Sequence, residues 1–288
     1  MLSPPLILSL VGLSICAWLF IKYLRRQNQK KLYQKPLSSD WIEVLQKNVA
    51  LYSMLPDALR KELHGHIQIF INEKEFIGQG IQITDEIKLT IAGSACILLL
   101  QDQNRVDEKR ISQNQIDKNR SFPDFTSIIV YPDTYVATQT KHDGLVEHQE
   151  YSARAGESWM RGPIVLSWKD VVRGSHHPRD GHNVVLHEFA HKLDEQNNTM
   201  DGLPVLQQKS QYAEWTKVFR EEYEALKKRA QRGKNKVLDE YGTVSPPEFF
   251  AVATESFFEK PRRMQKRLPN LYAQLKIFYR VDPASWHR

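Results

Sequence analysis

The chain has 288 residues, 41% of them hydrophobic and six of them tryptophan, which is enough for one large or two modest globular domains. Its net charge of +6 is concentrated at the N-terminus, where the first forty residues hold six lysine and arginine side chains against Asp40 alone. The rest is nearly neutral without an obvious basic face, so direct nucleic-acid binding is not expected. Cys16 and Cys96 stand in apolar runs, which predicts neither a disulfide framework nor a cysteine metal site.

An apolar run covers residues 6–24, with Lys22 as its only charge, and a basic cluster follows it directly. About nineteen helical residues come close to the roughly 30 Å of a bilayer core. A cleaved signal peptide would carry its basic residues before the run, and the positive-inside rule places the rest of the chain in the cytoplasm. We therefore predict a single-pass inner or plasma membrane anchor (1–26), a basic linker (27–40) and one domain (41–288). A signal sequence or a helix packed on the body are the alternatives.

The domain is expected to be α+β, rich in helices, with a small mixed sheet. Apolar residues at helical spacing predict helices over 41–55, 57–73, 85–100, 184–194, 212–231 and 269–280, and another from Glu248, where two prolines fit the start. Short β-rich runs cover 126–131, 134–138 and 163–168. A loop over 173–182 contains three histidines and leads into the helix that begins at residue 184.

Two histidines in that helix, His187 and His191, enclose Glu188 in the pattern H-E-x-x-H. Residues four apart on a helix are rotated by about 40°, so both imidazoles leave one face and can bind one Zn²⁺. Glu188 lies beside them, where a carboxylate can take a proton from a zinc-bound water. A core helix with a surface histidine pair also produces this pattern by chance, so a third ligand is needed.

The candidate third ligand is Glu248, which stands among apolar residues at the start of its helix. A catalytic zinc uses three protein ligands and leaves one position open for water, whereas a structural zinc site wants four. An acidic residue at a helix N-terminus is also favoured by the helix dipole, which is the alternative explanation of Glu248. Glu255 lies seven residues later on the same face. It is too far from the helix N-terminus for the dipole to explain an acidic residue there.

The sequence resembles the Mlc titration factor A family of zinc-dependent peptidases, whose active site is similar to that of the anthrax lethal factor protease domain. The resemblance covers roughly residues 41–283. It rests on stretches that begin at Ala92 (AGSACILLL), Ile129 (IVYP), Gly162 (GPIVLSW), His187 (HEFAHKLD), Asp201 (DGLP), Pro247 (PEFFAV) and Ser256 (SFFE). It implies a zincin-like metallopeptidase domain, one Zn²⁺ on His187, His191 and Glu248, and Glu188 as general base.

The resemblance also assigns Tyr241 and His148. Tyr241 would stabilise the oxyanion or steer a proton, because charge grows on the carbonyl oxygen in the transition state. From the sequence alone, a lone tyrosine there is more often a surface or packing residue. His148 matches a histidine that approaches the zinc at rest, but the spacing from it to Trp159 is one residue longer here, which leaves that assignment open.

The function expected is hydrolysis of peptide bonds in a peptide or protein substrate by a zinc-activated water, with Glu188 as general base. The alternative is a zinc-containing regulatory protein that sequesters a transcriptional repressor, with weak or incidental hydrolysis, since members of the resembled family bind such a repressor. The N-terminal apolar run is absent from that family's soluble members, so the partner does not transfer directly.

Asp194, one turn after His191, and Glu255 are predicted to orient the zinc ligands through hydrogen bonds. Replacing either with alanine is expected to weaken zinc binding by about 10- to 100-fold, measured by competition with a chromophoric chelator. Unchanged zinc affinity in a variant would remove that residue from this role.

Overall fold

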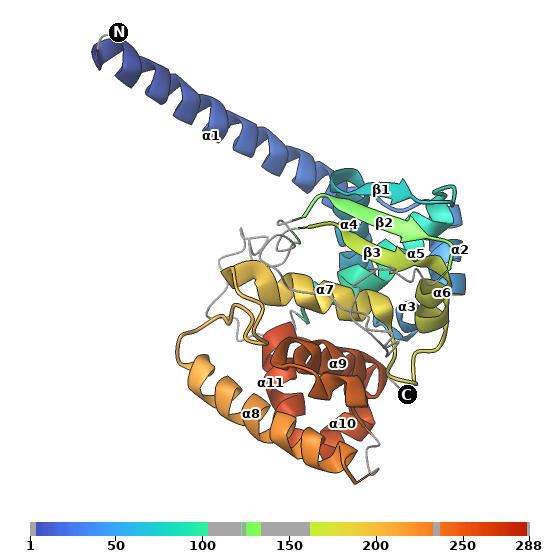
Figure 1. Ribbon diagram of the computed structural model, residues 1–288. Coiled ribbons are helices and arrows are strands. Elements are labelled where there is room, and N and C mark those ends of the chain that lie inside the picture. The colour runs from blue at the N-terminus through green and yellow to red at the C-terminus, as the bar shows by residue number, and fades with distance from the viewer. Residues whose placement is uncertain (1–3, 103–121, 123–124, 134–161, 233–236, 287–288) are drawn as a thin grey trace, which may run out of the picture.

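A computed structural model of the chain describes residues 4–102, 122, 125–133, 162–232 and 237–286, and the side chains of these residues from residue 12 onward. The fold is α+β and rich in helices, as predicted (Figure 1). The helices are α1 (Pro4–Gln34), α2 (Ser39–Asn48), α3 (Ala50–Met54), α4 (Asp57–Glu73), α5 (Asp85–Ile97), α6 (Trp168–His176), α7 (Val184–Asp194), α8 (Gln211–Ala230), α9 (Pro246–Glu259), α10 (Pro261–Arg267) and α11 (Pro269–Tyr279). The strands are β1 (Glu75–Gly78), β2 (Ser127–Tyr131) and β3 (Ile164–Ser167), and the short 3₁₀ turns are η2 (Glu195–Asn197), η3 (Glu240–Thr243) and η4 (Pro283–Ser285).

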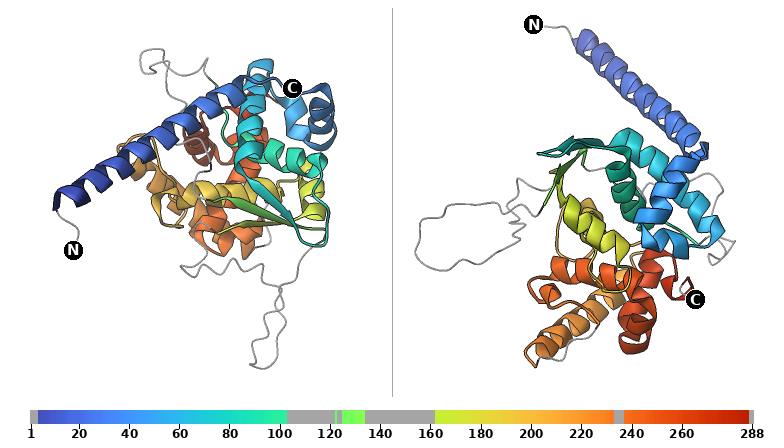
Figure 2. Two further views of the ribbon diagram at one scale, coloured as in Figure 1. Left: turned by 90° about the horizontal axis from the view of Figure 1, so that it is seen from above. Right: turned by 90° about the vertical axis from the view of Figure 1, so that its right-hand side faces the viewer.

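The N-terminal helix α1 projects from the body and packs against it only near its C-terminal end (Figures 1 and 2). That end lies on α4, where Arg25 and Gln29 both donate hydrogen bonds to Glu73 (3.1 and 2.8 Å). The ring of Tyr33 fills the space beside Gly65, where a Cβ would lie 2.5 Å from the ring. The predicted linker at 27–40 is therefore helical as far as Gln34 and continuous with the helix before it.

The membrane-spanning segment predicted at 6–24 is not supported. Over the described residues, no helix combines the length and the apolar character needed to cross a membrane. The side chains of residues 6–11 of that segment lie outside the described part of the chain.

The small sheet has the strand order β1-β2-β3, and the described strands pair only in parallel. The expectation of a mixed sheet is therefore wrong for these residues, and the predicted run at 134–138 lies outside them. Successive residues of a strand point to opposite faces, so Ile128, Val130, Ile164 and Leu166 are buried while Val165 is exposed. The sheet and the helices α4, α5 and α6 form one side of the body (Figure 1).

Helix α7 lies between that side of the body and the C-terminal helices (Figure 1). Phe189 on α7 is fully buried among Phe70, Phe122 and Phe125, with ring centroids 5.6, 4.8 and 5.7 Å away. His187 and His191 are two residues to either side of Phe189, so the helical period turns them towards the opposite face. The aromatic cluster thus fixes α7 with both histidines facing α9.

Helix α9 is the centre of the C-terminal half. Every residue from Glu248 to Glu259 is buried, as expected of a helix that is surrounded by other elements. Ser245 accepts a hydrogen bond from the N–H of Glu248 and so caps the helix, and two prolines occupy its first positions. Helices α8, α10 and α11 lie around α9 on the side away from α7 (Figures 1 and 2).

Some predicted elements have other limits in the structure. The helix expected over 41–55 is interrupted at Val49, whose backbone (φ −117°, ψ 89°) is not helical, and becomes α2 and α3. The loop expected over 173–182 begins only after His176, because residues 168–176 form α6 with Ser167 as its cap. Strand β1 and helix α10 were not predicted.

Candidate metal centre

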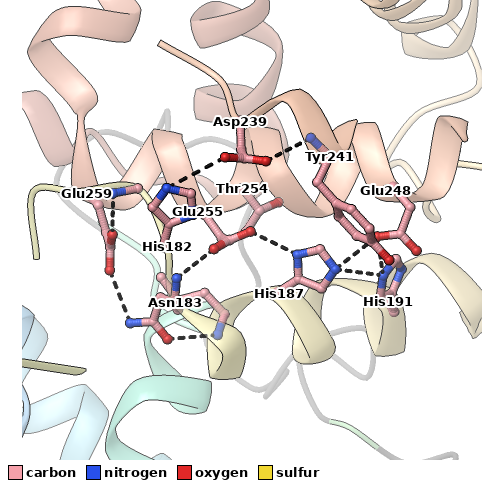
Figure 3. Close-up of polar contacts among 12 residues, drawn as sticks. His182, Asn183, His187, His191, Asp239, Tyr241, Glu248, Thr254, Glu255 and Glu259 are labelled. Carbon is pink, nitrogen blue, oxygen red and sulfur yellow. Dashed lines mark hydrogen bonds and ion pairs between the residues drawn. The ribbon is translucent and has the colours of Figure 1, made fainter. Parts of the chain in front are cut away.

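The candidate metal centre is formed by two histidines of α7 and one carboxylate of α9, which point toward one another (Figure 3). Nε2 of His187 lies 2.9 Å from Oε2 of Glu248 and 3.3 Å from Nε2 of His191. Nε2 of His191 lies 3.4 Å from the same Glu248 oxygen. These are the one group of three or more potential metal ligands among the described residues, and one ligand atom from each lies within 4.8 Å of the others.

The donor set suits a divalent cation such as Zn²⁺. Two imidazole nitrogens and a carboxylate oxygen from facing helices can take three corners of a tetrahedron and leave a fourth open. The structure therefore brings together all three residues that the sequence indicated.

The charges of the group favour an ionised carboxylate. Burial alone would raise the pKa of Glu248, but hydrogen bonds from His187 and His191 outweigh it and lower this pKa to about 2. Burial likewise lowers the pKa of His187, yet hydrogen bonds to Glu248 and Glu255 leave this pKa well above its usual value. The carboxylates therefore surround the imidazoles with negative charge, which also favours a bound cation.

Glu255 contacts the side of His187 that faces away from the ligand group. Its Oε1 lies 2.8 Å from Nδ1 of His187, and its Oε2 accepts a hydrogen bond of 2.6 Å from the N–H of Asn183. A histidine whose Nδ1 donates to a carboxylate presents the lone pair of Nε2 to a metal. Glu255 is therefore in position to orient the imidazole ring of His187.

Asp194 is fully buried, but its observed hydrogen bond is not with His191. Its Oδ2 accepts from the N–H of Gly202 at 2.7 Å, while its Oδ1 and Nδ1 of His191 have no hydrogen-bond partner within the described ranges. Burial raises the pKa of Asp194 to about 7. The observed contact holds the turn at Gly202, whose φ is +77°, and the role of Asp194 towards His191 stays a prediction.

Glu188 and Tyr241 lie beside the ligands. Glu188 follows His187 on α7 and is half-buried. Tyr241 lies on η3, 37% exposed, with its ring centroid 5.9 Å from that of His187 (Figure 3). Its N–H donates to Oδ1 of Asp239 at 2.7 Å, and Oδ2 of Asp239 lies 3.6 Å from Nε2 of His182. The tyrosine is thus held next to the candidate centre.

The three histidines between residues 173 and 182, all of which the structure describes, are not in the ligand group. His148 lies outside the described residues. Of the three histidines near the start of α7, His176 ends α6, His177 makes a hydrogen bond with the carbonyl of Arg173 (2.9 Å), and His182 is exposed and faces Asp239.

Asn183 and Glu259 are buried polar residues beside the centre that the sequence analysis did not single out. Asn183 caps α7 by accepting a hydrogen bond from Leu186 N–H, and its side chain donates to Oε1 of Glu259 at 3.1 Å. A signal for each was present: asparagine is a preferred N-cap, and Glu259 stands four residues after Glu255 on one helix face.

The model of one protein family, described as glucose-regulated metallo-peptidase M90, matches residues 22–280. The chain belongs to this family. The family name agrees with a chain that carries a possible metal-binding group at the contact between two buried helices.

Curated relatives agree with this membership. The chain is 36% identical over 277 residues to an uncharacterized protein of Synechocystis sp., with 95% of each chain covered. It is 38% identical over 164 residues to the Mlc titration factor A of Edwardsiella ictaluri (55% of this chain, 61% of the relative). It is also 26% identical over 270 residues to that of Yersinia pestis, with 92% of each covered. The resemblance to the Mlc titration factor A family is therefore confirmed.

The ionisation of Glu259 should make stability depend on pH. Burial raises its pKa to about 8, so its contribution to stability is complete below pH 4.5 and is lost as the pH rises towards 8. Glu259→Gln removes this titration. Relative to the variant, the wild type should lose on the order of a few kcal/mol of unfolding free energy between pH 5 and 8, measured by urea denaturation of metal-free protein. Parallel pH profiles of the two proteins would contradict this assignment.

Proposed function

We propose that this member of a metallopeptidase family is a zinc-dependent peptidase that hydrolyses peptide bonds. The observation that supports the proposal is the His187, His191 and Glu248 group, whose three ligand atoms converge at the buried contact of α7 and α9. Two histidines and one carboxylate are a donor set that zinc peptidases use, with a position left for water. The identity of the ion as Zn²⁺ rests on this chemistry.

A Zn²⁺ held by these three side chains would polarise the scissile carbonyl and lower the pKa of a water towards about 7. The carboxylate of Glu188 accepts a proton from the attacking water and passes it to the leaving amine. The hydroxyl of Tyr241 donates a hydrogen bond to the carbonyl oxygen as its negative charge grows. The substrate class is a peptide or protein chain.

A second candidate function is regulatory. Two of the relatives carry the name Mlc titration factor A, and the chain would accordingly bind a transcriptional repressor, with hydrolysis weak or incidental. The convergent ligand group favours the peptidase, because sequestration of a partner needs no catalytic metal.

The exposed apolar side chains of α1 bear on where the protein is located in the cell. Residues 13–24 of α1 expose apolar side chains that include Leu13, Trp18 and Phe20, and basic residues follow them. We propose that this segment attaches the chain to a membrane with the domain in the cytoplasm, where its basic residues would contact anionic lipid headgroups. Cell fractionation of the chain with and without residues 1–24 tests it, and an equal soluble fraction for both forms would contradict it.

Glu188→Gln should leave zinc content and thermal stability unchanged but lower peptide hydrolysis by about 100- to 10,000-fold, because the amide cannot accept the proton. Zinc content is measured by atomic absorption and turnover with a panel of chromogenic peptides. Equal turnover in the two proteins would exclude Glu188 as the base. Repressor binding that survives the substitution would show that sequestration is independent of catalysis.

Tyr241→Phe should lower kcat by about 10- to 1,000-fold with little change in KM, because the lost hydroxyl acts only on the charge of the transition state. Tyr212→Phe is the matched control, since the hydroxyl of Tyr212 accepts a hydrogen bond from Leu206 N–H, outside the ligand group. The role of Tyr241 fails if both variants retain wild-type kcat.

A further inference from the structure

Helix α9 presents three carboxylates along the face that meets α7 and the loop before it. Glu248, Glu255 and Glu259 occur at i, i+7 and i+11 and are all buried. Glu248 faces the two histidines, Glu255 contacts His187 and the N-cap residue Asn183, and Glu259 contacts Asn183 and the loop before α7 (Figure 3). The ligand Glu248 thus belongs to a longer row of acidic contacts between the two helices.

Asn183 joins the two carboxylates that are not ligands. It is 2% exposed and uses each of its polar side-chain atoms. Its N–H donates to Oε2 of Glu255 (2.6 Å), and its Nδ2 donates to Oε1 of Glu259 (3.1 Å) and to the carbonyl of Gly174 (3.3 Å). Its Oδ1 accepts from Leu186 N–H (3.1 Å) and so starts the helix that carries both histidines.

The position of Asn183 therefore affects His187 through Glu255. Both oxygens of Glu255 are engaged, one by Asn183 and the other by Nδ1 of His187. A displacement of Asn183 moves the oxygen that fixes the imidazole ring, and with it the direction of the Nε2 lone pair. Hydrogen-bond partners of ligating histidines influence metal affinity in this way.

Glu259 holds the side chain of Asn183 from the other direction. It is 2% exposed, and its Oε2 accepts a hydrogen bond from Gly181 N–H at 2.9 Å. Burial of a carboxyl group costs free energy, and an apolar side chain would fill such a position at lower cost. The hydrogen bonds that compensate for its burial come from the loop before α7. Glu259 therefore holds that loop in place.

We propose that Asn183 and Glu259 are positioning residues of the metal centre, which hold Glu255 and thereby keep Nε2 of His187 directed at the ion. This inference rests on the proposed metal site and adds two residues that lie outside the H-E-x-x-H pattern and its third ligand. Neither residue touches the ion or the substrate.

The test is the zinc affinity of the full-length chain, measured by competition with a chromophoric chelator. Asn183→Ser keeps a capping oxygen and the backbone N–H to Glu255 but removes both Nδ2 hydrogen bonds. It should raise the zinc dissociation constant by about 10- to 100-fold. Glu259→Gln keeps the volume and leaves one acceptor for two donors, so it should raise the constant less.

Asn48→Ser is the matched control. Asn48 is 3% exposed, and its Nδ2 donates to Glu86 (2.9 Å) and Thr90 (3.1 Å) on α5. This variant should lose thermal stability without a change in zinc affinity. An Asn183→Ser protein that is destabilised similarly but binds zinc as tightly as the wild type would overturn the proposal. If Asn183→Ser does not fold, Glu259→Gln decides, and wild-type affinity in that variant overturns the proposal.

The wild-type measurement separates this inference from the proposed function. Tight zinc binding by the wild type together with unchanged affinity in the variants contradicts only the positioning role. Absence of zinc binding by the folded wild type would overturn the metal site and the positioning role together.

Discussion

The contact between α7 and α9 is the constraint on which the centre depends. Carboxylates from α9 meet imidazoles from α7 at distances between 2.8 and 3.4 Å, in a region where both helices are largely buried. Buried charges are costly unless they are paired and hydrogen-bonded, so these groups require the two helices to keep one register. Breaking one partner would leave an uncompensated charge.

The two helices are held from outside by apolar packing. Phe189 fixes α7 by packing against Phe70, Phe122 and Phe125. Phe249 and Phe250 of α9 are buried beside Trp215 and Phe219 of α8. The ligands therefore lie on helices that aromatic residues of the hydrophobic core hold in place. The half-buried Glu188 and the partly exposed Tyr241 are more accessible than His191 and Glu248, so they form the more accessible side of the centre.

The sequence predicts those parts of the centre that depend on helical periodicity. The spacing of His187 and His191 and the shared face of Glu248 and Glu255 follow from 3.6 residues per turn, and the structure brings these residues together. Periodicity cannot say which helix α9 meets, and the resemblance to a known family supplied that pairing. Glu259 lies one turn after Glu255 on the same face of α9, so the same spacing also predicts its position.

Features that depend on long-range pairing were not predictable in this way. Strand β1 has four residues directly after α4, and its parallel pairing with β2 joins segments about fifty residues apart. Val49 interrupts a stretch whose apolar spacing continues through it. Asp194 lies one turn from His191, yet its Oδ2 accepts a hydrogen bond from the N–H of Gly202 in a later turn. The pairing of β1 in particular is decided by a partner strand that is distant in sequence.

The most direct test of the metal centre is a crystal structure of zinc-loaded protein with anomalous diffraction collected at the zinc edge. The account predicts one zinc peak per chain, within about 2.0–2.2 Å of Nε2 of His187, Nε2 of His191 and a carboxylate oxygen of Glu248. A peak bound by other residues, or no peak between these three side chains in zinc-saturated crystals, would contradict it.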